Sequence, residues 1–210
     1  MIGIVDYGMG NLFSVSKALE RLGAEYFISS DPGELTKARA LILPGVGAFK
    51  DAMNQLDSLG LIPFLREYAL SGRPFLGICL GMQLLFESSE EHGFSEGLAL
   101  LPGRIRHFPG QDAGGTAYKV PHMGWNRLKF HVPSPLFDGI TEDYVYFVHS
   151  YFAVTDAAII NASAEYGEEV PAVVSRNNVM GMQFHPEKSG GMGMALLRNF
   201  INLSESKVAL

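Results

Sequence analysis

Hydrophobic positions follow two alternating spacings along the first half of the chain. Short apolar runs that have the length of buried strands cover residues 2–5, 25–29, 40–43 and 74–78. Apolar residues at helical spacing predict helices over residues 12–22, 52–59, 64–69 and 80–86. Alternation of strand and helix is typical of a parallel sheet that is covered by helices.

The second half is richer in strands. These are predicted over residues 144–148, 159–164, 172–175 and 179–184, before a final helix over residues 193–203. The sheet should therefore be mixed, with antiparallel strands added late. Because no repeat or linker interrupts the chain, we predict one α/β domain over residues 1–210. It should be an open, mostly parallel mixed sheet with helices on both faces, and its tail at 203–210 should fray.

The composition excludes several functional classes. Hydrophobic residues make up 47% of the 210 residues, enough to form a sizeable core. The net charge of −6 argues against binding to nucleic acid, because such proteins carry clusters of Lys and Arg. Asp6 interrupts the first apolar run, so this run is no signal peptide, and Gln83 breaks the longest one, which is too short to span a bilayer. The single cysteine cannot form an internal disulfide and suits a reducing compartment, so we expect a cytoplasmic protein.

The densest chemical signal is Gly77-Ile78-Cys79-Leu80-Gly81, at a strand-to-helix junction. It matches a nucleophile elbow with Cys in place of Ser. The sharp turn exposes the side chain, and the flanking glycines leave room for neighbouring backbone. The following helix and a nearby imidazole favour the thiolate, and the N–H of Leu80 points to an oxyanion. The alternative is a buried, inert cysteine, which the paired glycines disfavour.

His185 is the best placed of six histidines to act as the base. It follows the apolar run 179–184, and Glu187 lies two residues further on. In an extended segment such residues point the same way, so Glu187 can hold one ring nitrogen while the other faces Cys79. His-Pro-Glu alone is weak evidence, but with the elbow it predicts a Cys–His–Glu triad. No second histidine at ligand spacing supports a metal site, so no metal is expected.

Three other segments could complete a pocket. The segment Pro44-Gly45-Val46-Gly47 follows a strand and could present backbone N–H groups to an anion, although a tight turn is the simpler interpretation. Gln83 lies one helical turn beyond Cys79, where its amide could touch a substrate. His149-Ser150-Tyr151 interrupts two apolar strands with polar groups, which is typical of a pocket rim.

Two glycine-containing stretches receive no role. Gly8-Met9-Gly10 lacks the third glycine of a dinucleotide fingerprint, because Phe13 occupies that position, so no nucleotide cofactor is expected. The stretch 107–119 is interpreted as a flexible surface loop.

The segments 77–83 and 185–187 resemble the motifs of triad-type glutamine amidotransferases. Four further blocks resemble one branch of that family, the glutaminase subunits of histidine biosynthesis; they cover residues 6–11, 44–47, 121–126 and 149–151. The resemblance spans nearly the whole chain, and the block at 121–126, Pro-His-Met-Gly-Trp-Asn, narrows it to this branch.

The resemblance implies an enzyme that hydrolyses glutamine to glutamate and ammonia without a cofactor. A cyclase partner with a (β/α)₈ barrel would use the ammonia to make imidazole glycerol phosphate and an aminoimidazole carboxamide ribotide. It also implies that Cys79, His185 and Glu187 form the triad, with Val46 and Leu80 as the oxyanion donors. The residues that would hold glutamine are Gly47, Gln83, Glu91, Ser150 and Tyr151. Those that would face the partner are Trp125, Asn126 and Lys188.

The sequence leaves three alternatives open: an amidotransferase subunit of another pathway, a stand-alone cysteine hydrolase or peptidase, and a catalytically silent binding module. An intact triad disfavours the last. A further hypothesis concerns regulation. Because glycine tolerates both signs of φ, the loop 45–47 can rotate a peptide. We expect the N–H of Val46 to point away from the oxyanion until the cyclase binds its nucleotide.

Overall fold

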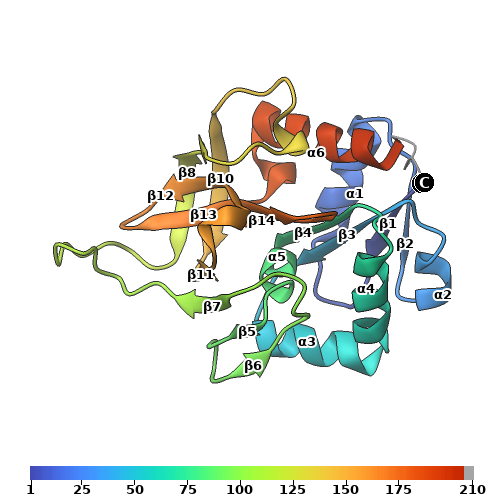
Figure 1. The fold of residues 1–210 in the computed structure, drawn as a ribbon, viewed down its shortest axis with the longest axis horizontal. Coiled ribbons are helices and arrows are strands. Elements are labelled where there is room, and N and C mark those ends of the chain that lie inside the picture. The colour runs from blue at the N-terminus through green and yellow to red at the C-terminus, as the bar shows by residue number, and fades with distance from the viewer. Residues whose placement is uncertain (206–210) are drawn as a thin grey trace.

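A computed structural model describes residues 1–205 of the protein (Figure 1). Its main sheet has eight strands in the order β2-β1-β3-β4-β14-β13-β12-β9. These strands are β1 Ile2–Val5, β2 Tyr26–Ser29, β3 Ala40–Gly45, β4 Phe75–Cys79, β9 Lys129–Phe130, β12 Ile160–Glu165, β13 Glu169–Arg176 and β14 Val179–Met182. The α-helices are α1 Leu12–Arg21, α2 Pro32–Leu35, α3 Phe49–Ser58, α4 Leu61–Leu70, α5 Leu80–Leu84 and α6 Gly190–Glu205. Short 3₁₀ helices cover Pro135–Phe137, Ala157–Ile159 and Pro186–Lys188.

The order of the strands confirms the predicted mixed sheet. From β2 to β14 all neighbours run parallel, whereas β13, β12 and β9 are antiparallel. Helices α1 and α6 cover one face, and α3, α4 and α5 cover the other (Figure 1). Residues buried on both faces, such as all of β1, explain the continuous apolar runs of the first half.

Two smaller sheets extend the second half of the fold. Strand β8, His122–Arg127, pairs antiparallel with β10, Tyr144–His149. Strand β11, Tyr151–Val154, pairs with β7, Arg104–His107, which continues to β5 and β6 at Ser88–Ser89 and Ser95–Glu96. The apolar pattern did not predict β8, because its one buried residue, His122, is polar, whereas the apolar Met123 and Trp125 are exposed.

The chain ends and loops differ in part from expectation. Helix α6 begins three residues earlier than predicted and continues to Glu205, so residues 203–205 of the expected frayed tail are helical. The rest of that tail, 206–210, lies outside the described residues. The stretch 107–119 joins β7 to β8, carries one bridge between Gln111 and Ala117, and projects from the body of the molecule (Figure 1). Within residues 1–205, no helix has the length and apolar character needed to cross a membrane.

Candidate active site

Cys79 lies where β4 ends and α5 begins, in a backbone conformation that few residues adopt. Its φ is +54° and its ψ is −113°, which is strained for a residue with a Cβ. Leu80 is the first residue of α5, so its N–H has no acceptor within the helix. The structure thus forms the predicted elbow at a strand-to-helix junction, but the Cys79 side chain is buried rather than exposed as predicted.

The glycines around Cys79 allow three backbone segments to meet. A Cβ on Gly81 would lie 1.8 Å from the carbonyl oxygen of Leu43, and one on Gly77 would lie 2.5 Å from the carbonyl oxygen of Gly81. A Cβ on Gly45 would lie 2.5 Å from the hydroxyl of Tyr7. Strands β3 and β4 and helix α5 can therefore approach only because these positions lack side chains.

His185 and Glu187 form a buried pair next to Cys79. The Nδ1 of His185 lies 2.8 Å from Oε1 of Glu187. Burial lowers the pKa of His185, but its hydrogen bonds with the Cys79 and Glu187 side chains outweigh burial and raise this pKa to about 10. The ring is therefore an imidazolium held between a sulfur and a carboxylate, which suits a thiolate nucleophile.

The local geometry of this pair differs from the prediction. Strand β14 ends at Met182, and Pro186–Lys188 is a 3₁₀ helix rather than an extended segment. The expected reason for the contact, that alternate residues of a strand point the same way, was wrong. A tight turn instead carries Glu187 back toward the ring of His185.

A cavity of about 370 Å³ opens beside Cys79 and His185. It is lined by all of the residues predicted for the oxyanion hole and the substrate: Val46, Leu80, Gly47, Gln83, Glu91, Ser150 and Tyr151. A larger cavity of about 640 Å³ lies between residues 130–140 and the end of α6, and none of the predicted site residues lines it. Chemistry rather than volume therefore identifies the candidate site.

The N–H of Val46 points away from this cavity. It donates to the carbonyl oxygen of Met9 at 2.8 Å. The next residue, Gly47, has a φ of +105°, which favours glycine. Of the two predicted oxyanion donors, Val46 is thus engaged elsewhere in this structure, as the regulatory hypothesis expected.

Two glutamine side chains connect Cys79 to the pocket rim. Nε2 of Gln83 donates to the carbonyl oxygen of Tyr151 at 2.9 Å and to Oε1 of Gln183 at 3.1 Å. Nε2 of Gln183, which is fully buried, lies 3.9 Å from Sγ of Cys79. The apolar run 179–184 predicts a core strand and gives Gln183 no role, although a polar residue two positions before His185 is a usable signal.

Glu91 and Tyr151 both line this cavity. Oε2 of Glu91 accepts from the N–H of Phe49 at 2.7 Å, at the start of α3, where helix geometry favours an anion. Burial raises the pKa of the Tyr151 phenol, and the nearby charges of Glu91 and Glu90 add to the rise. The Glu91 carboxylate gives one side of the cavity a negative charge that suits an amino group.

The three predicted partner residues are placed differently from one another. Trp125 is exposed on β8, and a Cβ on Gly190 would lie 4.0 Å from its ring. Lys188 is exposed at the mouth of the cavity. Asn126, in contrast, is turned inward: its Oδ1 lies 2.8 Å from Nε2 of His122. Trp125 and Lys188 are therefore available to a partner, whereas the Asn126 amide is used within the chain.

The sequence family described as glutamine amidotransferase class-I matches residues 3–203. This match spans almost the whole chain and includes the elbow and the His-Pro-Glu segment, so the chain belongs to the class-I glutamine amidotransferases. Within that class it is similar to imidazole glycerol phosphate synthase subunit HisH. The HisH of Shouchella clausii is 62% identical, with 98% of this chain and 99% of that protein covered. The HisH of Bacillus subtilis is 54% identical, with 99% of each covered.

Solved structures confirm the fold. A crystal structure of a glutamine amidotransferase matches with a TM-score of 0.75 at 20% identity and covers 97% of this chain and 98% of its own. A structure of PurLQS from Thermotoga maritima matches with a TM-score of 0.73 at 18% identity and covers 96% and 97% of the two chains. At these identities the likeness establishes the shared α/β architecture.

Proposed function

We propose that the chain is the glutamine-hydrolysing subunit of an imidazole glycerol phosphate synthase. It releases ammonia from glutamine and passes it to a cyclase subunit with a (β/α)₈ barrel. The cyclase makes imidazole glycerol phosphate and aminoimidazole carboxamide ribotide in histidine biosynthesis. The observation that carries the proposal is the meeting of the Cys79 elbow and the His185–Glu187 pair at one cavity. A lone thiol suits a reducing compartment, so the proposed location is the cytoplasm.

In the first half-reaction, the thiolate of Cys79 attacks the side-chain amide carbon of glutamine. A C–S bond forms, and the carbonyl oxygen becomes an oxyanion that accepts from the N–H of Leu80. The C–N bond then breaks as the imidazolium of His185 gives its proton to the departing nitrogen. Ammonia leaves, and a glutamyl thioester remains on Cys79.

In the second half-reaction, neutral His185 takes a proton from water, and the resulting hydroxide attacks the thioester. The C–S bond breaks, glutamate leaves and the thiolate is restored. Glu187 accepts from Nδ1 of His185 throughout, so it fixes the tautomer and keeps Nε2 available to Cys79 and to the reacting groups.

The second oxyanion donor is proposed to be gated. The N–H of Val46 faces the carbonyl oxygen of Met9, and only a rotation of the Gly45–Val46 peptide can turn it toward the oxyanion. Nucleotide binding by the cyclase would drive this rotation through an interface that includes Trp125 and Lys188. Glutamine is then hydrolysed quickly only when the ammonia can be used.

Glutamate release from glutamine tests the proposal, measured with the chain alone, then with the cyclase subunit and its nucleotide. The chain alone should be slow, and both additions together should raise the rate steeply. Cys79→Ala should abolish release under every condition, and release that survives this change would contradict the triad. A high rate that is indifferent to the cyclase would leave the triad intact but refute the pathway and the gate.

A further inference from the structure

Two buried histidines that have no part in the proposed mechanism face each other at the pocket rim, where His149 also lines the cavity. His149 is the last residue of β10, and His122 is the first residue of β8; the two strands pair them in direct register. Nδ1 of His122 lies 2.9 Å from Nε2 of His149. Their position joins the turn at 149–151 to the strand that carries Trp125.

The outer nitrogen of each ring contacts an oxygen that can only accept. Nδ1 of His149 lies 2.8 Å from the carbonyl oxygen of Tyr151. Nε2 of His122 lies 2.8 Å from Oδ1 of Asn126. The orientation of the Asn126 amide is fixed, because its Nδ2 donates to the carbonyl oxygen of Glu165 at 2.9 Å. Both outer ring nitrogens must therefore carry a hydrogen.

If both rings are neutral, no hydrogen remains for the contact between the two inner nitrogens. Two neutral imidazoles carry one N–H each, and the outer contacts use both. The two nitrogens that face each other at 2.9 Å would then present two lone pairs to one another. We propose that the pair of His122 and His149 holds a third hydrogen between these nitrogens, carries one positive charge, and positions the turn that forms the pocket rim.

The surroundings favour placing this charge on His122. Its ring is stacked between the rings of Tyr166, at 3.9 Å, and Phe147, at 4.6 Å. Aromatic faces attract a cation, and the Asn126 oxygen and the His149 nitrogen each accept one of its two N–H groups.

Other features of the site oppose the charge. Burial lowers the pKa of both rings, although the hydrogen bond to Asn126 acts against it at His122. At His149, the hydrogen bond to the carbonyl oxygen of Tyr151 also acts against burial, whereas the positive charges of His122 and His185 lower the pKa further. The two stacked rings and the two acceptors are what offset these costs. His185 and Tyr166 are the titratable neighbours of the pair on the elements packed against it.

The pair acts on the pocket through the carbonyl group of Tyr151. That oxygen also accepts from Nε2 of Gln83 at 2.9 Å, and Gln83 contacts Gln183 beside Cys79. His149 thus fixes the oxygen against which Gln83 is held. With the central hydrogen lost, repulsion between the two rings would displace the turn at 149–151, which lines the cavity. The pair therefore controls the fit of glutamine rather than the chemical step.

Nitrogen NMR of the intact, isotope-labelled chain at pH 8 tests the charge, because a histidine with an ordinary pKa of about 6.5 is neutral there. His122 should show two protonated ring nitrogens, and its Nδ1 should show a scalar coupling through the hydrogen bond to Nε2 of His149. His185→Asn identifies the signals of the other protonated ring. Two neutral rings at 122 and 149 without this coupling would overturn the proposal, whether or not the chain hydrolyses glutamine.

Asn126→Leu removes the acceptor that requires the extra hydrogen. A neutral His122 can then donate from Nδ1 to His149, so the imidazolium signal should disappear at pH 8 while the coupling persists. Asn126→Asp keeps an acceptor and should keep the imidazolium. An imidazolium that survives Asn126→Leu would contradict the count of hydrogens.

The positioning role, which rests on the proposed glutaminase activity, is tested by the kinetic constants of that reaction. His122→Leu should raise KM for glutamine about fivefold, the effect of one lost hydrogen bond, while kcat changes less than about twofold. His122→Asn retains a donor near the position of Nδ1 and should restore KM. An unchanged KM in His122→Leu, or a loss confined to kcat, would refute the positioning role. The charge of the pair, which NMR measures, would be unaffected by that result.

Discussion

Nδ1 of His185 lies 2.8 Å from Oε1 of Glu187, although only Pro186 separates the two residues in the chain. The 3₁₀ turn over Pro186–Lys188 makes this short-range contact possible. Both side chains are almost completely buried, so water and salt screen the pair much less than a surface ion pair. The base is therefore oriented before any substrate enters.

Replacing Glu187 by Gln should lower the pKa of His185 and reduce stability near neutral pH. The folded pKa of about 10 lies above the unfolded value of 6.5, so the stabilisation is complete below pH 6.5 and is lost as pH rises toward 10. The difference in the free energy of unfolding between wild type and variant should shrink over that range. Urea unfolding at several pH values measures it.

Glu34→Gln is the control for this experiment, because Glu34 forms an exposed ion pair with Lys37. Exposed pairs contribute little to stability, so this variant should track the wild type at every pH. A difference for Glu187→Gln that stays constant from pH 6.5 to 10 would show that His185 does not carry the raised pKa.

Gly81→Ala should destabilise the protein by about 3 kcal/mol or more, since the new Cβ would meet the carbonyl oxygen of Leu43 at 1.8 Å and the backbone must shift. Gly191→Ala is the control: a Cβ there has no neighbour within 4 Å, and in a helix the change should be neutral or stabilising by up to about 1 kcal/mol. Thermal and urea unfolding of both variants compare them. Equal stabilities would contradict the close approach at the elbow.

Strands β1, β3 and β4 were predictable because they are buried on both faces and form continuous apolar runs, whereas β2 at the edge of the sheet is only partly buried. Strand β8 was not predictable, because it buries His122 and exposes Met123 and Trp125, so its pattern is neither continuous nor apolar. A short sequence pattern therefore predicts a strand best where both faces of the strand are buried.

The site shows the same division between local and distant information. Cys79, His185 and Glu187 lie in short motifs whose chemistry can be read from neighbouring residues. The contact between Gln83 and Gln183 joins positions 100 residues apart, and no local pattern specifies it. Asn126 remains predicted to face the partner, and no local pattern specifies that its amide contacts His122 and Glu165.

Gln183→Leu should lower kcat/KM for glutamine roughly tenfold or more, because it leaves the buried amide of Gln83 without one acceptor and removes a donor beside the Cys79 sulfur. Gln55→Leu makes the same chemical change on the exposed side of α3 and should leave the activity unchanged. Glutamate release with the cyclase and its nucleotide is the measurement. Equal activities of the two variants would show that Gln183 is only a core residue.

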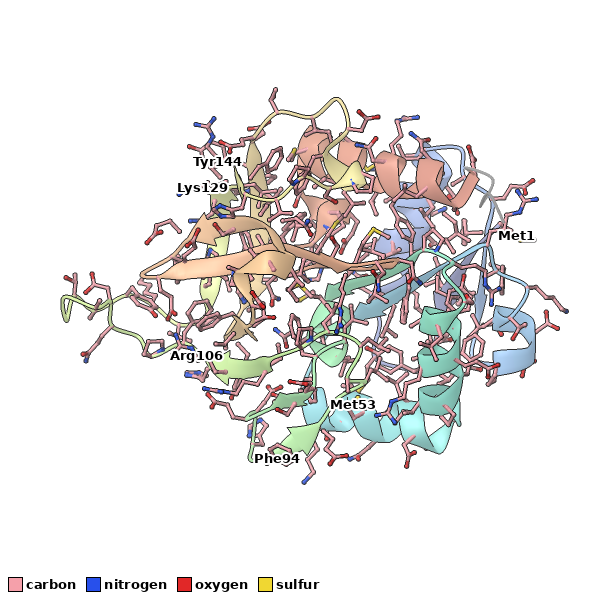
Figure 2. All side chains as sticks on the ribbon, in the orientation of Figure 1. Met1, Met53, Phe94, Arg106, Lys129 and Tyr144 are labelled. Atoms are coloured by element: carbon pink, nitrogen blue, oxygen red, sulfur yellow. The ribbon has the colours of Figure 1, made fainter. Side chains whose placement is uncertain are left out.

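Trp125→Ala should weaken binding to the cyclase by about 2 kcal/mol or more, as expected for an aromatic residue at the centre of an interface. Phe94→Ala is the control. Phe94 lies between β5 and β6, away from β8 (Figure 2), and is 76% exposed, compared with 53% for Trp125. Calorimetry with the cyclase subunit measures both affinities, and an unchanged affinity of Trp125→Ala would place the interface elsewhere.

Val46→Pro separates the gated donor from the rest of the site, because proline lacks the N–H. In the chain alone this N–H faces the carbonyl oxygen of Met9, so the slow unstimulated rate should change little. With the cyclase and its nucleotide, loss of an oxyanion donor should lower the rate about a hundredfold. Val46→Ala keeps the N–H and should respond to the nucleotide like the wild type. A Val46→Pro variant that the nucleotide stimulates fully would show that the Gly45–Val46 peptide does not bind the oxyanion. Of the two proposed donors, Leu80 alone would then supply the oxyanion hole.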